Sequence, residues 1–583
     1  MAETLISPGV LALENDQSFI TQQPVTVGAA LIGPTVKGPV EVPTLVTSYS
    51  DYQNKFGTTF LSASQVQTYF TSVAAYNYFN NGGQTLLVAR VVSGSFASAT
   101  TATGSVTGPL GGGVSILNAD TSQSIVLSTL SQGAIMNSSS SLDSSGALVS
   151  GSPENIRWQI VNHDTASGTF ALLVRQGDDN TNNRTVLESW TNLSMDPTAP
   201  NYVARVIGNQ TKEYNAADNQ IEVLGDYVNN SRYVYVESVS TPTPFYFDNN
   251  GVAKPALTGS VPVNASGSFV GATGNLFGAG AKYNNNIVSG VTNIQGLVTS
   301  SYTNMVNLFA NQDDYRFNVI LTPGLFASEG PLGASAVTSI ISNTQNRGDS
   351  IYVSDLVPFS SSINTVTGQA NAKNTSYAAS YWPWVQTIDP DSAQLIWVPA
   401  STMIGGVYAY NDSVSEPWFA PAGINRGGLG SVVRAEKKLT QTNRDTLYSN
   451  KVNPIATFPG IGTVVYGQKT LQTQASSLDR VNVRRLLIAL KGYISQVAQN
   501  LVFEQNTIAT RNSFLSQVNP YLETVQQRQG LYAFKVIMDD SNNTPDVIDR
   551  NQLVGQIYLQ PTRTAEFIYL DFNVLPTGVT FPA

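Results

Sequence analysis

The alternation of apolar and polar residues predicts two blocks in which strands and helices follow each other. Short apolar runs beside Gly-Pro turns are typical of buried strands, and apolar residues at intervals of three and four are typical of amphipathic helices. In the first block these patterns predict strands at 27–32, 44–47 and 85–92, a short helix from Ser50 or Asp51 to Gly57, and a helix at 66–79. In the second they predict a strand at 317–321 before a Pro-Gly turn, a helix at 334–342 and a strand at 349–353.

The segment between these blocks has a different composition. No Lys or Arg occurs between Arg90 and Arg157, and Ser, Thr and Gly dominate residues 94–152. This composition predicts a β-rich or loop-rich surface insertion, with disorder of part of it as the alternative. Strands are predicted again at 156–161 and 169–174.

The C-terminal part of the chain predicts two helices beside a small sheet. Asp479 is a suitable N-cap for a helix with one apolar face that runs to about Glu504. Asn519-Pro520, a cap followed by proline, predicts the start of a second helix that ends at Gly530. Alternating residues then predict strands at 532–538, 557–559 and 568–574.

Together these patterns predict an α+β protein. Its mixed-sheet core domain with flanking helices is split by a β-rich inserted domain, because core-type elements stand on both sides of the middle segment. Extended arms are predicted at the N- and C-terminal ends. The predicted units are an N-terminal arm (1–23), the first part of the core (24–93), the Ser/Thr/Gly-rich surface insertion (94–152), the β-rich inserted domain (153–300), the second part of the core (301–478), and a C-terminal domain with a terminal strand (479–583).

Composition and charge narrow the possible functions. Charged residues make up 12% of the chain, about half the usual share of roughly 25%, which suits a protein covered by copies of itself. The net charge of −9 argues against a nucleic-acid groove. The sequence has no cysteine, which excludes disulfides, thiol catalysis and cysteine zinc sites. Long apolar runs and a basic N-terminal start are both missing, so we expect neither membrane insertion nor a signal peptide.

Candidate catalytic, cofactor and metal motifs are weak. Residues 462–470 nearly spell a phosphate-binding loop, but Gln468 separates the last Gly from Lys469 and an apolar strand lies between the glycines. His163 is the sole histidine and falls in a predicted polar loop, so any Ser-His-Asp triad must use it. The acidic cluster at 539–546 lacks EF-hand spacing. We therefore expect no catalytic residue, no cofactor and no metal ion.

Ordered phrases along the chain carry a family resemblance. The first core block contains IGPTVKGP and FNNGG, the middle contains NLSMDP, and the second block contains WVPAS and WFAPAG. The C-terminal part contains VNVRRLLIALKGYI and LYAFKV. In this order the phrases resemble the contractile tail sheath proteins of tailed bacteriophages, the myovirus-type sheath family.

The resemblance implies a structural virion subunit and not an enzyme. It implies that copies of the chain polymerise as helically stacked hexameric rings around the tail tube and contract to drive the tube through the host envelope. The implied partners are further copies, the tail tube protein, and the baseplate and tail terminator proteins, with assembly in the host cytoplasm. No nucleic acid partner is expected.

The resemblance also implies strand exchange between subunits. The N-terminal arm and a C-terminal strand of one subunit would complete sheets of its neighbours by β-augmentation. The residues assigned to this exchange are Ser7, Pro8, Gly9, Val10, Leu11, Leu13, Phe567, Ile568, Tyr569, Leu570 and Phe572.

A basic stripe on the first C-terminal helix is the candidate tube contact. Arg480, Arg484 and Lys491 share one side of the helix by their spacing, and no acid follows until Glu504. In the sheath family a C-terminal helix touches the tail tube, so the resemblance assigns these three residues to that contact. Pairing with acids elsewhere in this chain is the alternative.

Two other functions remain possible from the sequence. One is a glycan-binding or hydrolytic surface protein that acts through residues 94–300. The other is a different self-assembling shell or surface-layer protein.

Overall fold

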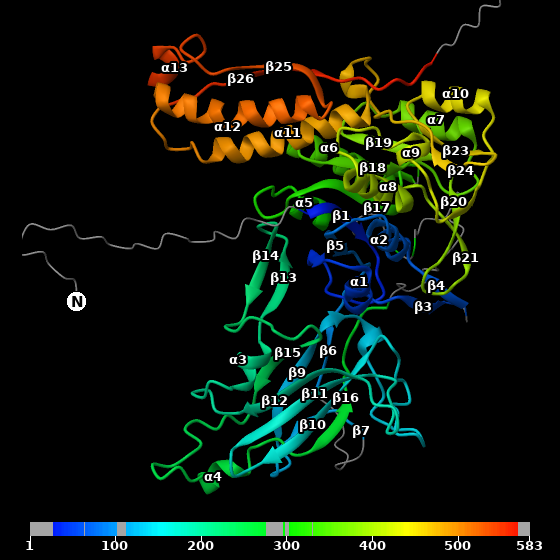
Figure 1. Ribbon diagram of the computed structural model, residues 1–583. Helices are drawn as coiled ribbons and strands as arrows, with labels where there is room; N and C mark the ends of the chain where they lie inside the picture. Colours follow the sequence, from blue (N-terminus) through cyan, green and yellow to red (C-terminus); the bar gives the residue numbers. More distant parts are fainter. Residues whose placement is uncertain are drawn as a thin grey trace, which may run out of the picture.

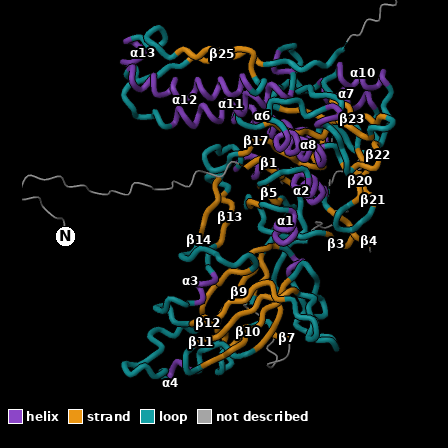
Figure 2. Tube along the Cα trace, viewed as in Figure 1, coloured by secondary structure: helices purple, strands orange, loops and turns teal. Residues whose placement is uncertain are grey.

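The computed structural model describes residues 27–62, 65–101, 112–275, 295, 297, 302–328 and 330–568. Figure 1 shows a β-rich body at the bottom, a core of helices around a sheet in the middle, and a helical hairpin beside a two-stranded sheet at the top. In Figure 2 strands dominate the lower body and helices the upper one.

One eight-stranded sheet joins the two predicted core blocks. Strand β1 (Val27–Gly33) pairs in parallel with β5 (Leu86–Arg90) and with β17 (Phe317–Phe326), so that Ala30 lies opposite both Leu87 and Ile320. The edge strands β2 and β24 pair antiparallel, so the sheet is mixed, as predicted. The strand order is β2-β5-β1-β17-β18-β19-β23-β24, with β2 (Thr44–Val46), β18 (Ile351–Asp355), β19 (Ala378–Trp382), β23 (Asn453–Phe458) and β24 (Gly462–Val465).

Helices cover both faces of this sheet. Ala29 and Leu31 pack into one apolar cluster with helices α1, α2 and α8, whereas Ala30 and Ile32 pack into a second cluster with α5, α6 and α7. Because successive strand residues point to opposite faces, burial on both sides requires continuous apolar runs such as residues 27–32. The helices are α1 (Tyr49–Phe56), α2 (Phe70–Asn80), α5 (Thr303–Leu308), α6 (Gly330–Arg347), α7 (Ile363–Asn371) and α8 (Ser401–Val414).

The apolar pattern at 66–79 proves to be part strand and part helix. Residues Gln65–Thr68 form β4, which pairs with β3 (Thr59–Ser62), and α2 begins only at Phe70. The short helix α1 is capped by Ser48, whose side chain accepts the Asp51 N–H, and not by Ser50 or Asp51 as predicted. A further small sheet and two short helices complete the core: β20 (Val385–Ile388), β21 (Leu395–Val398), β22 (Val432–Ala435), α9 (Gly423–Arg426) and α10 (Gln441–Ser449).

The β-rich body is built from both middle segments of the sequence. Strand β9 (Gln123–Gln132) pairs antiparallel with β15 (Val234–Val239), and Ile125 and Leu127 share one apolar cluster with Trp158. The predicted boundary at residue 152 therefore does not separate two units among the described residues. The other strands are β6 (Ser98–Thr100), β7 (Gly112–Gly113), β8 (Ile116–Leu117), β10 (Ile156–Asp164), β11 (Thr169–Gln176), β12 (Val186–Ser194), β13 (Thr211–Asn215), β14 (Gln220–Leu224) and β16 (Ala265–Ser268), with the short helices η1 (Ala134–Met136), α3 (Val203–Ile207) and α4 (Pro255–Thr258).

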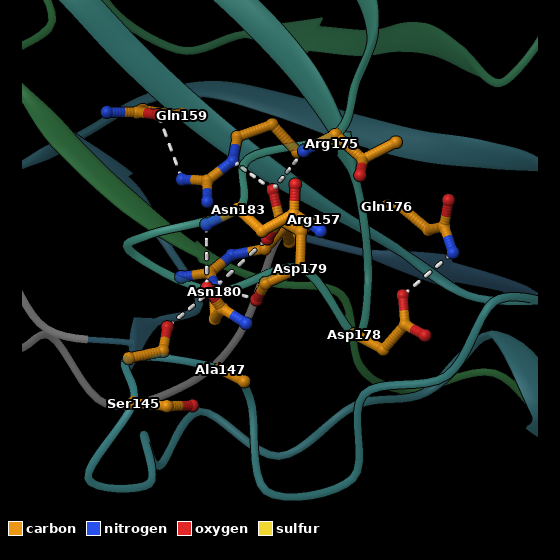
Figure 3. A network of polar contacts seen from close by, with 12 residues as sticks. Ser145, Ala147, Arg157, Gln159, Arg175, Gln176, Asp178, Asp179, Asn180 and Asn183 are labelled. Carbon is orange, nitrogen blue, oxygen red and sulfur yellow. Dashed lines mark hydrogen bonds and ion pairs between the residues drawn. The ribbon is translucent and has the colours of Figure 1, made fainter.

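A buried charge network fixes the loop that follows β11 (Figure 3). The Asp179 carboxylate accepts from Arg175 Nε at 2.6 Å and lies 3.4 Å from Arg157 Nη1, and all three side chains are buried. Arg175 also donates to Gln159 at 2.9 Å. Because a buried charge is costly unless it is paired, this arrangement holds the loop in one position against strands β10 and β11.

The C-terminal unit packs two long helices beside a two-stranded sheet. The helices are α11 (Val481–Gln499) and α12 (Ile508–Gln527), and β25 (Leu531–Ile537) pairs antiparallel with β26 (Gln556–Pro561); the short helix α13 (Pro545–Asp549) lies between the two strands in sequence. Two sequence predictions are wrong here. The N-cap of α11 is Arg480, because Asp479 ends the preceding short helix η3 (Ser477–Asp479), and Pro520 lies inside α12.

The third strand predicted in this unit, at 568–574, lies outside the described residues after Ile568. Among the residues that are described, no helix has the length and apolar content needed to span a membrane.

Candidate assembly surface

The sheet of β25 and β26 offers two unpaired edges. In the described part of the chain each of these strands pairs only with the other, so one row of backbone N–H and C=O groups on each is left without a strand partner. Two aromatic side chains of these strands, Tyr532 and Tyr558, are 64% and 55% exposed. An edge of this kind is a template for another strand.

The segment that follows this sheet is held by hydrogen bonds at Thr562, Thr564 and Glu566. After β26 the chain runs through Thr562 to Ile568, and Phe567 and Ile568 are 69% and 77% exposed. Glu566 between them and the sheet is anchored: its carboxylate accepts from Arg480 Nε at 2.7 Å, from the Tyr448 hydroxyl at 2.7 Å and from Gln468 Nε2 at 3.1 Å.

The surroundings of Glu566 favour its charged form. Burial alone would raise the pKa of this carboxyl, but the hydrogen bonds from Arg480 and Tyr448 and the Arg480 charge together hold the pKa below its ordinary value. The chain is therefore fixed at Glu566 and presents apolar side chains directly after it.

The predicted basic stripe does not form on the surface. Arg480 is engaged by Glu566 and Asp479, and Arg484 is buried with its guanidinium 3.9 Å above the Tyr377 ring and a hydrogen bond to Ser376. Lys491 alone of the three is exposed. Arg480 follows the alternative weighed from the sequence, in which the basic residues pair with acids of the same chain. The tube contact stays a prediction, and of the three residues only Lys491 is exposed for it.

Arg485, which the sequence did not single out, joins α11 to the core. It is buried, forms an ion pair with Asp412 of α8, and lies 4.7 Å over the Tyr408 ring. A second contact joins the core to the end of α12, where Trp418 Nε1 donates to the Arg528 carbonyl at 3.0 Å. The signal that could have identified Arg485 is its position as a charged residue among the apolar residues of the predicted helix, but its partner Asp412 lies 73 positions away.

A cavity of about 880 Å³ lies where the helical hairpin meets the core. Its lining includes the aromatic residues Trp418, Phe419, Tyr466 and Tyr532, and the arginines Arg426, Arg444 and Arg563. None of these three arginines forms an ion pair with a described residue. We refer to it below as the arginine-lined cavity.

The structure shows where the residues of the weak catalytic and metal motifs lie. Residues Gly462–Val465 form strand β24, so the Gly-rich stretch is not a loop at a helix start. His163 lies in strand β10 and not in a loop, with Nδ1 2.8 Å from the Pro262 carbonyl. No group of three or more His, Cys, Asp or Glu residues within the described ranges could hold a metal ion.

The remaining residues assigned to strand exchange lie outside the described residues. These are Ser7, Pro8, Gly9, Val10, Leu11, Leu13, Tyr569, Leu570 and Phe572. Only Phe567 and Ile568 of that set are placed by the structure, and both are exposed.

Two domain families match the second half of the chain. Residues 297–471 match the phage tail sheath protein central domain, and residues 473–575 match the phage tail sheath C-terminal domain.

Curated relatives carry the same description. The tail sheath protein of Vibrio phage KVP40 is 39% identical over 240 residues, which cover 40% of this chain and 36% of that protein. The tail sheath protein of Salmonella phage ViI is 28% identical over 368 residues, which cover 58% of each chain. The chain therefore aligns with little more than a third of the first relative and somewhat more than half of the second.

A solved structure shares the fold over most of its length. The crystal structure of the sheath tail protein from Listeria innocua superposes with a TM-score of 0.50 at 10% identity and covers 92% of this chain and 95% of that one.

Proposed function

We propose that this chain, whose residues 297–471 and 473–575 match the phage tail sheath central and C-terminal domains, is a structural subunit of a contractile tail sheath. In this proposal copies polymerise as stacked hexameric rings around the tail tube, between baseplate and tail terminator proteins. Contraction of the rings drives the tube through the host envelope. The β-rich body is a domain inserted into the sheath core.

The open-edged sheet followed by an exposed apolar segment is the observation that carries the proposal. Within the described residues β25 and β26 each have one edge without a strand partner, and Phe567 and Ile568 directly follow the bound Glu566. A strand from a second copy that pairs with such an edge gains backbone hydrogen bonds of about 0.5–1.5 kcal/mol each. The N-terminal segment from Ser7 to Leu13 and the C-terminal segment from Phe567 to Phe572 are the proposed exchanged strands.

The contacts of α11 give this exchange a route into the core. A force on the C-terminal segment acts on Glu566 and, through its ion pair, on Arg480 at the start of α11. The ion pair between Arg485 of α11 and Asp412 then connects this helix to α8. Helix α8 packs in the same apolar cluster as strand β17 of the core sheet. Force between neighbouring subunits can thus be transmitted to the core during a change of lattice geometry.

Electron microscopy of the purified protein tests the proposal. We expect tubes or stacked rings with a wide lumen; flat sheets would favour a surface-layer protein, and monomers that bind glycans would favour a function of residues 94–300. Deletion of residues 2–20, or the change Ile568→Asp, is expected to give folded protein that no longer polymerises.

The matched control is Val252→Asp on the β-rich body, where the side chain is 61% exposed. It is expected to polymerise normally. Normal tubes from both the deletion and the Ile568→Asp variants would contradict strand exchange.

A further inference from the structure

The turn between α11 and α12 exposes an apolar side chain on strained backbone. Phe503 is fully exposed and has φ 71, in the left-handed region that a bulky side chain rarely adopts. Val502 and Ile508 beside it are 60% and 64% exposed. Strain and full exposure at one aromatic residue point together to a contact with another molecule, because neither is explained by packing within the described chain. We name Val502, Phe503 and Ile508 the apolar tip.

The apolar tip and the arginine-lined cavity lie at opposite ends of one helical hairpin. Asn482 near the start of α11 and Gln526 near the end of α12 line the cavity, whereas the apolar tip joins the other ends of the two helices. Helix α11 has 19 residues, which span about 27 Å at 1.5 Å per residue. Figure 1 shows the hairpin extending away from the core, with its tip beside α13. The tip of one chain cannot reach the cavity of the same chain.

The two surfaces are complementary in shape and charge. The tip lies at the outer end of the hairpin (Figure 1) and carries Glu504, an exposed acid that forms no ion pair with a described residue. The cavity is concave and lies near the upper end of the roughly 300–1,000 Å³ typical of ligand sites. Its lining combines aromatic side chains with three arginines that form no ion pair with a described residue, and with two acids, Asp445 and Glu566, of which Glu566 is bound by Arg480. Aromatic and arginine side chains in a concavity are typical anchors of protein interfaces.

We propose that the apolar tip of one copy inserts into the arginine-lined cavity of a second copy, with Phe503 against the aromatic wall and Glu504 beside the arginines. The contact is heterologous, since the two copies use different surfaces. Repetition of a heterologous contact closes a ring or continues as a helix. The inference rests on the proposed self-assembly and adds to it an interface in which the hairpin turn of one copy meets a cavity of the second copy that residues 562–567 help to line.

Single-cysteine variants test the contact directly, because the natural sequence has no cysteine. Phe503→Cys is mixed with Tyr532→Cys or with Tyr466→Cys, both on the cavity lining, and the mixture is assembled and oxidised. We expect a disulfide-linked dimer in the mixture with at least one of the two cavity variants, and none from Phe503→Cys alone, because the sulfur atoms must approach within a bond length. Val252→Cys, similarly exposed on the β-rich body, is the matched control and should not link to Phe503→Cys.

A second variant tests the same contact without disulfide cross-linking. Phe503→Asp is expected to raise the concentration needed for polymerisation about tenfold or more, with unchanged circular dichroism of the monomer, whereas Val252→Asp leaves it unchanged. Tubes that form without a cross-link at either cavity position, or a cross-link from Phe503→Cys to a tail tube protein instead, would overturn the inference and leave the proposed function intact. A wild-type protein that never assembles would contradict both.

Discussion

Glu566 illustrates how a chain with few charges uses each of them. Charged residues are only 12% of the sequence, and this carboxylate is satisfied by Arg480, Tyr448 and Gln468 together. Its pKa is lowered in the folded protein, so its contribution to stability is present above its ordinary pKa of 4.5 and is lost as the pH falls through the folded value. The anchor of the C-terminal segment is therefore expected to weaken in acid.

Replacement of this carboxylate measures the anchor at the residue scale. Glu566→Gln is expected to lower the free energy of opening of the first turns of α11 by about 1–2 kcal/mol at pH 7, because a charged acceptor is lost at a partly screened site. The measurement is native-state hydrogen exchange at pH 7 and pH 4, and the difference from wild type should shrink at the lower pH.

The exposed ion pair between Arg550 and Asp546 supplies the control. Both side chains are largely in water, and Asp546→Asn is expected to change stability by less than about 0.5 kcal/mol. An effect of Glu566→Gln that is no larger than this would show that the segment is not held at Glu566.

Helices α11 and α12 show, at the scale of elements, what a sequence pattern can and cannot predict. The apolar stripe of α11 and the strands β25 and β26 were predicted close to their true bounds, because burial follows local periodicity. The start of α12 was not, because a proline usually begins a helix. Here the cap is Thr507, and the buried stripe of Phe514, Val518 and Leu522 continues past Pro520, so tertiary packing outweighs the local signal.

In the candidate assembly surface, too, local sequence patterns could be predicted and contacts between distant residues could not. Alternation predicted a strand at 568–574, and the family resemblance assigned Phe567 and Ile568 to strand exchange; the structure shows both side chains exposed. The contacts of Arg484 were not predicted. Its neighbour Tyr377 is distant in sequence, and no periodic pattern reports such a contact. A charge reversal at Arg484 would therefore disturb the fold and would not isolate a tube contact.

The ion pair that joins α11 to α8 is tested by replacing the buried Arg485 with an uncharged residue. Arg485→Met leaves Asp412 without its partner and is expected to lower the free energy of unfolding by about 2–3 kcal/mol, somewhat less than for a fully buried pair because Asp412 is partly exposed. Lys491→Met, on the exposed side of the same helix, should change it by less than about 0.5 kcal/mol. Urea unfolding followed by circular dichroism gives both values, and equal effects would contradict this role of the ion pair.

At the scale of the whole molecule, the β-rich body is joined to the core by a buried polar joint. Arg90, at the end of β5, donates to the carbonyls of Gly38 at 2.6 Å and Gln132 at 2.7 Å, and burial lowers its pKa to about 10. Lys37 and Glu154 add an ion pair at 2.9 Å across the same boundary. The hairpin of β13 and β14 braces the two bodies at a second place, where its side chains pack against the second core cluster.

These ties predict that the β-rich body and the core unfold together. Arg90→Met keeps an apolar stem but removes the guanidinium donor from both carbonyls and leaves Gly38 O with the Gln132 N–H. This change is expected to weaken the joint by about 2–4 kcal/mol and to split one calorimetric transition into two. Arg232→Met, an exposed position on the β-rich body, should leave a single transition. Two transitions already in the wild-type protein would mean that the joint does not couple the bodies. If the joint does couple them, any rotation of the core within a ring is passed on to the β-rich body as a rigid movement, because the buried guanidinium binds carbonyls of both bodies.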